Sequence, residues 1–132
     1  MRSLVPVLIA ATALAATPAV AKEKLAPEAQ LAKLLEGRTA GEPQDCITLS
    51  SVSDSQVIDK TAIVYRIGGT LWVNRPTTGA ESLNDDVVLV TKLPTGRLCS
   101  IDTVELHDRT SHFYRGFVGL GKFVPYRRAA SD

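Results

Sequence analysis

A hairpin signal at Gly68-Gly69 constrains the fold of this chain more than any other feature. The two glycines can adopt the positive φ angles of a two-residue β turn, and strand-like segments flank them at residues 62–67 and 70–75. This turn places Tyr65 opposite Trp72, an aromatic cross-strand contact that contributes up to about 1 kcal/mol. The other predicted pairs are Ile67–Thr70, Arg66–Leu71, Val64–Val73 and Ile63–Asn74.

Further strand candidates surround this hairpin. Residues 46–49 and 56–59 are short β candidates, and residues 87–91 form a continuous apolar run that we expect to be covered on both faces. Another strand starts at Arg97, and a change of side-chain parity near Asp102 predicts a bulge or a strand end there. The predicted fold class is mainly β, a small antiparallel curled sheet or partial barrel around one shared core, with a short N-terminal helix.

Residues 22–37 are predicted to form that short helix. Pro27 suits the first helical position because its missing N–H needs no partner there. Leu31, Leu34 and Leu35 fall at i, i+3 and i+4, which makes a narrow apolar stripe. A helix this short is marginal alone, so we expect it to lie on the sheet as a lid.

The first 21 residues have the layout of a secretory signal peptide. A basic start precedes an apolar run at residues 4–16, and Ala19-Val20-Ala21 supplies the small residues that precede cleavage at Lys22. The run is shorter than the roughly 20 apolar residues of a membrane-spanning helix. We therefore expect export and a mature form without a membrane span, divided into a short helix and loop at 22–45 and a single antiparallel β domain at 46–132.

Cys46 and Cys99 are the two cysteines of the chain. In an oxidising compartment such a pair predicts one disulfide, which restricts the unfolded chain by roughly 4 kcal/mol in the entropic description. The alternative is a reactive thiol pair, which prefers close spacing and cationic neighbours. Both cysteines lie in apolar, strand-like runs, and this favours the structural bridge.

Composition narrows the class of partner. The chain has 132 residues with 15 Lys and Arg against 14 Asp and Glu, a formal net charge of +1. This length allows one domain, and the near-neutral charge argues against a nucleic-acid binder, which needs an excess of cations. An envelope protein, a glycan or a small ligand remain as candidate partners.

The segment from Asp102 to His112 holds the candidate chemistry of the chain. His107, Asp108 and His112 are weak candidates for zinc or copper ligands, because two imidazoles and a carboxylate suit either metal. Their spacing is not that of a helical pair, and a solvated loop holds the same residues equally well. We therefore assign no metal, cofactor or catalytic residue, and keep an enzyme or metal-binding protein that uses this segment as the alternative.

Three other patterns are weaker. Residues 116–122 match seven positions of a phosphate-binding loop, but Phe123 replaces the required Ser or Thr, which favours a glycine-rich β turn before a final aromatic strand. The acidic loop at residues 77–86 lacks the alternating ligands of a calcium loop around Glu81, Asp85 and Asp86. If the chain were a secreted inhibitor, the same loop would be its contact segment.

The chain also resembles a family of short, uncharacterised secreted proteins of Gram-negative bacteria. The resemblance rests on Cys46-Ile47, Val57-Ile58-Asp59, Leu98-Cys99-Ser100-Ile101-Asp102 and the closing run at residues 119–126. It implies periplasmic or extracellular residence and a mostly β domain with paired cysteines, and it suggests that the Asp102 carboxylate caps backbone donors. We expect a non-catalytic binding or structural module of the cell envelope.

Overall fold

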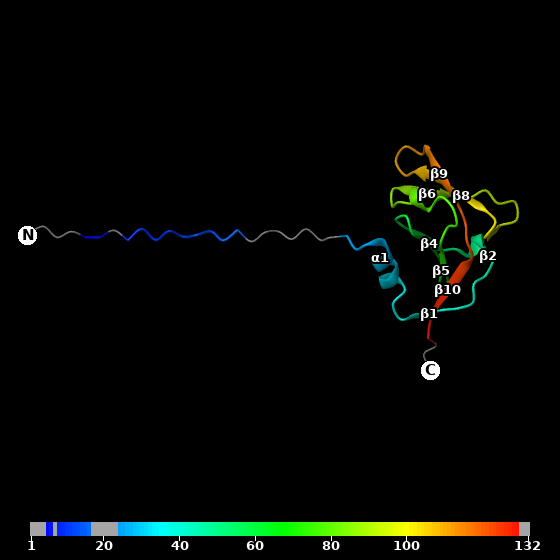
Figure 1. The fold of residues 1–132 in the computed structure, drawn as a ribbon, viewed down its shortest axis with the longest axis horizontal. Coiled ribbons are helices and arrows are strands. Elements are labelled where there is room, and N and C mark those ends of the chain that lie inside the picture. Colours follow the sequence, from blue (N-terminus) through cyan, green and yellow to red (C-terminus); the bar gives the residue numbers. More distant parts are fainter. Residues whose placement is uncertain (1–4, 7, 17–23, 130–132) are drawn as a thin grey trace, which may run out of the picture.

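Within the residues described, the fold consists of three antiparallel sheets, one short α-helix and the 3-10 helices Leu49–Ser51 and Ala80–Ser82 (Figure 1). The computed structural model describes residues 5–6, 8–16 and 24–129. The bounds are α1 Pro27–Leu34, β1 Arg38–Ala40, β2 Cys46–Thr48, β3 Asp54–Ile58, β4 Ala62–Ile67, β5 Thr70–Asn74, β6 Val87–Val90, β7 Arg97–Cys99, β8 Thr103–Asp108, β9 Tyr114–Gly119 and β10 Phe123–Arg128. The sheets have the orders β1-β10-β5-β4-β3, β6-β8-β9 and β2-β7. The prediction of a mainly β, antiparallel fold with a short helix is confirmed.

The predicted hairpin forms between β4 and β5. All five predicted pairs occur, with Tyr65 opposite Trp72, and Gly68 has a φ of 57° in the turn. Tyr65 is buried and also packs against Phe123 of β10, with 6.0 Å between ring centroids. The hairpin therefore forms the centre of the five-stranded sheet.

Two buried clusters lie on opposite faces of this sheet, where the sequence predicted one shared core. Ile63 and Tyr65 of β4 point into a larger cluster shared with the two smaller sheets. Ala62 and Val64 point to the other face, where they meet Leu31 of α1. Because neighbouring residues of a strand face opposite sides, the buried run of β4 contributes to both clusters.

Helix α1 covers the second cluster, as the lid prediction requires. Leu31 is buried there, and Leu34 and Leu35 pack against the same cluster. The helix begins at Pro27, later than the predicted range of 22–37, and Gly37 follows it with a φ of 72°.

The predicted loop at residues 38–45 is wrong in part. Residues 38–40 form β1, in which Arg38 pairs with Arg128 of β10, and Gln44 forms an isolated bridge with Phe123. These partners lie more than seventy positions away in the sequence, so no local sequence pattern predicts the pairing. Residues 38–40 therefore belong to the five-stranded sheet.

The predicted disulfide is confirmed. Cys46 and Cys99 lie directly opposite each other on β2 and β7 and are bonded through their sulfurs, and no cysteine is free. The bridge joins two short strands that form a sheet of their own. Both sulfurs are therefore bonded to each other, and neither is a free thiol.

The parity change near Asp102 is a strand end. β7 ends at Cys99 and β8 begins at Thr103, and the Asp102 carboxylate accepts a hydrogen bond from the Cys99 N–H at 2.7 Å, as the cap prediction requires. Ile101 lies in the intervening turn and is exposed. Residues 87–91 were also expected to be covered on both faces, and this prediction is wrong. β6 is an edge strand, and Val88 is only half-buried.

The glycine-rich segment at residues 116–122 crosses between two sheets. β9 ends at Gly119 and β10 begins at Phe123, so a strand follows where a phosphate-binding loop has a helix. Gly121 is held by Asn74, whose amide donates to the Gly121 carbonyl at 2.7 Å and accepts from its N–H at 3.0 Å. Asn74 is fully buried, and it is the single buried polar side chain among the residues described.

The predicted signal peptide lies partly outside the described residues, and its cleavage site at Lys22 lies wholly outside them. Residues 5–6 and 8–16 form no helix or strand and are exposed. In the part of the chain that the structure describes, no helix is long and apolar enough to cross a membrane.

Candidate functional site

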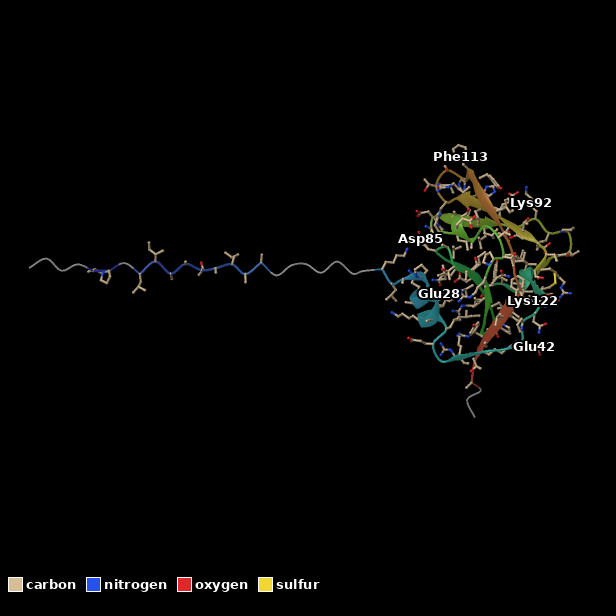
Figure 2. The ribbon with its side chains drawn as sticks, in the orientation of Figure 1. Glu28, Glu42, Asp85, Lys92, Phe113 and Lys122 are labelled. Atoms are coloured by element: carbon tan, nitrogen blue, oxygen red, sulfur yellow. A yellow bond between two sulfur atoms is a disulfide. The ribbon has the colours of Figure 1, made fainter. Side chains whose placement is uncertain are left out.

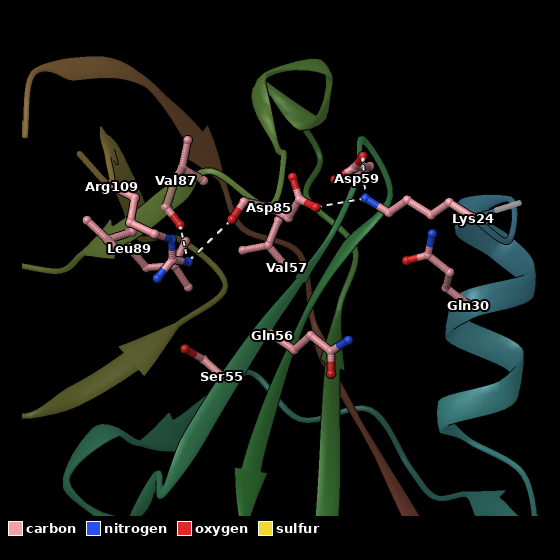
Figure 3. A pocket seen from close by; sticks show the side chains of 11 residues that line it. Lys24, Gln30, Ser55, Gln56, Val57, Asp59, Asp85, Val87, Leu89 and Arg109 are labelled. Atoms are coloured by element: carbon pink, nitrogen blue, oxygen red, sulfur yellow. Dashed lines mark hydrogen bonds and ion pairs between the residues drawn. The ribbon is translucent and has the colours of Figure 1, made fainter. Parts of the chain in front are cut away.

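A groove lies between β3 and β6, the outer strands of two different sheets. Its volume is about 570 Å³, and β3, β6 and the segment that leads into α1 line it (Figure 3). The lining residues are Lys24, Gln30, Ser55, Gln56, Val57, Asp59, Asp85, Val87, Val88, Leu89 and Arg109. The groove is therefore bounded on two sides by strand edges.

The peptide groups of two β3 residues point into this groove. In an antiparallel pair, alternate residues bond to the partner strand and the residues between them point away. The two-residue turn makes Ile67 a residue whose peptide group bonds to β5. Val64 lies an odd number of positions from Ile67, so its peptide group bonds to the other neighbour, at Gln56 of β3. The peptide groups of Ser55 and Val57 therefore face away from β4 and toward the groove.

The facing edge on β6 is partly covered. The Arg109 N–H donates to the Asp86 carbonyl at 2.8 Å, so the peptide group of Asp86 points toward the β8 side. Val87 and Leu89 consequently present their peptide groups to the groove. The Arg109 side chain donates to the carbonyls of Asp85 and Val87, each at 3.3 Å (Figure 3). This guanidinium occupies carbonyl acceptors at one end of the β6 edge, so the β3 edge is the more open of the two strand edges.

A charged cluster closes the upper end of the groove as drawn in Figure 3. The Lys24 ammonium donates to the Asp85 carboxylate at 2.7 Å and lies 3.8 Å from the Asp59 carboxylate. The hydrogen bond from Lys24 lowers the pKa of Asp85, and the same bond raises the pKa of Lys24. Both groups are thus held in their charged forms around neutral pH, which suits recognition of a polar ligand better than proton transfer.

His107, a predicted metal candidate, lies on β8 and points to the outer face of the three-stranded sheet. Its Nε2 lies 3.0 Å from the Glu105 carboxylate, and its Nδ1 lies 3.1 Å from the His112 carbonyl oxygen. The Glu105 carboxylate raises the pKa of His107. The contact with His112 is to its backbone, so the two imidazoles do not converge on one point.

Asp108 organises the turn between β8 and β9. Its carboxylate accepts the N–H groups of Thr110 and Ser111 at 2.9 and 2.8 Å and pairs with Arg115 at 3.0 Å. These backbone hydrogen bonds lower the pKa of Asp108. His112 has a φ of 62° in the same turn. No three His, Cys, Asp or Glu side chains within the described ranges gather as a metal site, and the structure does not unite His107, Asp108 and His112.

The acidic loop at residues 77–86 packs against the fold. Thr78 forms a bridge with Gly119, residues 80–82 form a short 3-10 helix, and Leu83 is buried in the larger cluster. Figure 2 shows Asp85 on the side of α1, whereas the exposed Phe113 lies at the far tip near β9. Of this loop, Asp85 alone lines the groove.

Sequence reasoning missed the groove. Of the Asp102–His112 segment, Arg109 alone lines it. Asp85 comes from the acidic loop, and the other lining residues come from segments that carried no chemical motif. No sequence signal marks β3 and β6 as neighbours, because each becomes an edge through the order of its own sheet.

Comparison with known proteins finds no matching family model, no matching curated protein and no matching solved structure.

Proposed function

We propose that this chain is an exported, non-catalytic binding module of the bacterial cell envelope, and that its groove binds an extended segment of a partner protein. The observation that carries the proposal is the open edge of β3, where the peptide groups of Ser55 and Val57 face the groove. Unpaired strand edges recruit extended peptides through main-chain hydrogen bonds. We also propose that the chain belongs to the family of short secreted proteins of Gram-negative bacteria that its sequence resembles.

The walls of the groove suit such a peptide. Val57 and Leu89 offer half-buried apolar surface on opposite sides, where alternate side chains of an added strand would pack. Arg109 already occupies carbonyls of β6, so the added strand would pair with β3. The Lys24–Asp85 pair would meet a polar group at the end of the peptide.

Export has separate support. The layout of residues 1–21 is that of a signal peptide, and the Cys46–Cys99 bridge is the kind of bond that persists in the periplasm or outside the cell. Mass spectrometry of exported protein should find Lys22 at the N-terminus. An intact Met1 would contradict the signal peptide.

The strand-addition proposal is tested by photo-crosslinking in the cell envelope. A photoreactive residue replaces Gln56, which is exposed and lines the groove. Ser55→Pro removes an N–H that points into the groove while the β3–β4 ladder stays intact, so we expect it to abolish capture of the partner. Ser55→Ala is the matched control, because it removes the hydroxyl and keeps the N–H, and it should capture normally.

Capture must depend on the strand edge to support the proposal. If folded Ser55→Pro protein captured the same partner as Ser55→Ala, strand addition would be wrong. Val57→Pro removes the other outward N–H and gives a second test should Ser55→Pro fail to fold.

A further inference from the structure

Four cationic side chains surround a second cavity on the helix side of the five-stranded sheet. Lys33 comes from α1, Arg38 from β1, Arg66 from β4 and Arg128 from β10. The cavity has a volume of about 470 Å³. It adjoins the groove, and its other lining residues are Leu25, Gln30, Leu34, Gln56 and Leu71.

The strand register fixes three of these cations on one face of the sheet. Arg38 and Arg128 are directly opposite each other in the β1–β10 pair. Arg66 is opposite Leu71, and Leu71 is opposite Tyr126, which precedes Arg128 by two positions on the same face. Like charges directly opposite are destabilising, so this arrangement costs stability when the cavity holds no anion.

No carboxylate forms an ion pair with these four cations within the residues described. The ion pairs of that part of the chain use other cations. Asp54 lies opposite Arg66 across β3–β4, but it forms none of these ion pairs and does not line the cavity. Burial and the positive charges of Arg128 and Arg66 lower the pKa of Arg38.

Arg38 is held in place and keeps an unused donor. Its Nη1 donates to the Gly69 carbonyl at 2.7 Å and to the Tyr126 carbonyl at 3.2 Å. Its Nε is buried and has no hydrogen-bond partner. The two carbonyls thus fix the Arg38 guanidinium at the wall of the cavity, where its positive charge can act on an anion.

We propose that this cavity binds the phosphate group of a phosphate monoester. Guanidinium groups match the oxygens of phosphate in charge and in planar geometry. Four converging cations favour a dianion over a single carboxylate, which would leave most of the positive charge uncompensated. Leu25, Leu34 and Leu71 form the apolar part of the wall, where the rest of the ligand would lie.

Side-chain NMR of the whole protein tests the proposal, with inorganic phosphate as the probe. Phosphate should shift the guanidinium N–H signals of Arg38 and Arg66, which line the cavity, in a saturable way. Arg128→Gln removes a charge-assisted contact and should weaken this binding by about tenfold. Arg127→Gln is the matched control, since it makes the same charge change on the next residue, which lies on the other face beside Trp72. It should change binding by less than about twofold, because an exposed charge outside the site is screened.

Two further titrations distinguish a soluble phosphate monoester from a lipid headgroup as the ligand. Glycerol phosphate represents a soluble monoester, and vesicles that contain phosphatidic acid, compared with vesicles of phosphatidylcholine alone, represent a lipid whose headgroup is a phosphate monoester. The site is supported if the soluble monoester or the vesicles bind, and if this binding is weakened by Arg128→Gln and not by Arg127→Gln. Unmoved guanidinium signals of Arg38 and Arg66, or equal weakening by Arg127→Gln and Arg128→Gln, would overturn it. The groove stays testable on its own, because its readout is the difference between Ser55→Pro and Ser55→Ala, and Ser55 lines the groove and not the cavity.

Discussion

Replacement of Asn74 by alanine should be among the most destabilising single changes in the fold. Asn74 is fully buried at the end of β5, and its amide makes two hydrogen bonds with the peptide group of Gly121, at 2.7 and 3.0 Å. Gly121 lies in the segment that crosses from β9 to β10. The amide thus fastens the connection between two sheets.

The magnitude follows from the groups left without partners. Each lost hydrogen bond removes about 1 kcal/mol, and a buried N–H or C=O left unpaired costs about 1–3 kcal/mol. Both groups of Gly121 lose their partner at once, so we expect Asn74→Ala to lower the free energy of unfolding by about 3–5 kcal/mol. This is a large share of the roughly 5–15 kcal/mol typical of a domain.

Urea unfolding followed by circular dichroism measures this loss. Asn84→Ala is the matched control, because Asn84 accepts one hydrogen bond, from the Asp86 N–H at 2.8 Å, near the surface. We expect the control to cost less than about 1 kcal/mol. Equal losses in the two variants would refute the reasoning, since the cost would then not come from the buried pair of bonds.

Three further outcomes are expected. Replacing Cys46 and Cys99 together by serine should lower the free energy of unfolding by about 4 kcal/mol, measured in urea, because the bridge closes a loop with a sequence separation of 53. NMR titration of His107 should give a pKa above the ordinary value, and Glu105→Gln should bring it down. The stability from this pair is fully present below the ordinary histidine pKa and is lost as pH rises through the raised one. Gln56→Pro should cost about 2–4 kcal/mol in urea, because it breaks the β3–β4 ladder, whereas proline one residue earlier should cost less than about 1 kcal/mol.

Local patterns in the sequence were sufficient for the hairpin and the helix. Gly68-Gly69 sets a two-residue turn, and a two-residue turn leaves one register for the flanking strands, which the structure reproduces pair by pair. Pro27 and the leucine stripe likewise place α1 and its buried face. The disulfide needed only a count of cysteines and an inferred compartment.

The groove and the cationic cavity arise from contacts between distant parts of the chain. β3 and β6 become edges through the order of their sheets, and Arg38 meets Arg128 only because β1 pairs with β10, ninety positions away. A three-residue strand such as β1 carries no periodicity of its own, so its local sequence resembles a loop. The sequence alone therefore determined the turns, the faces of the longer elements and the covalent bridge. The tertiary structure alone decided which strand edges stay open and which charges share a face, because both depend on pairing between remote segments.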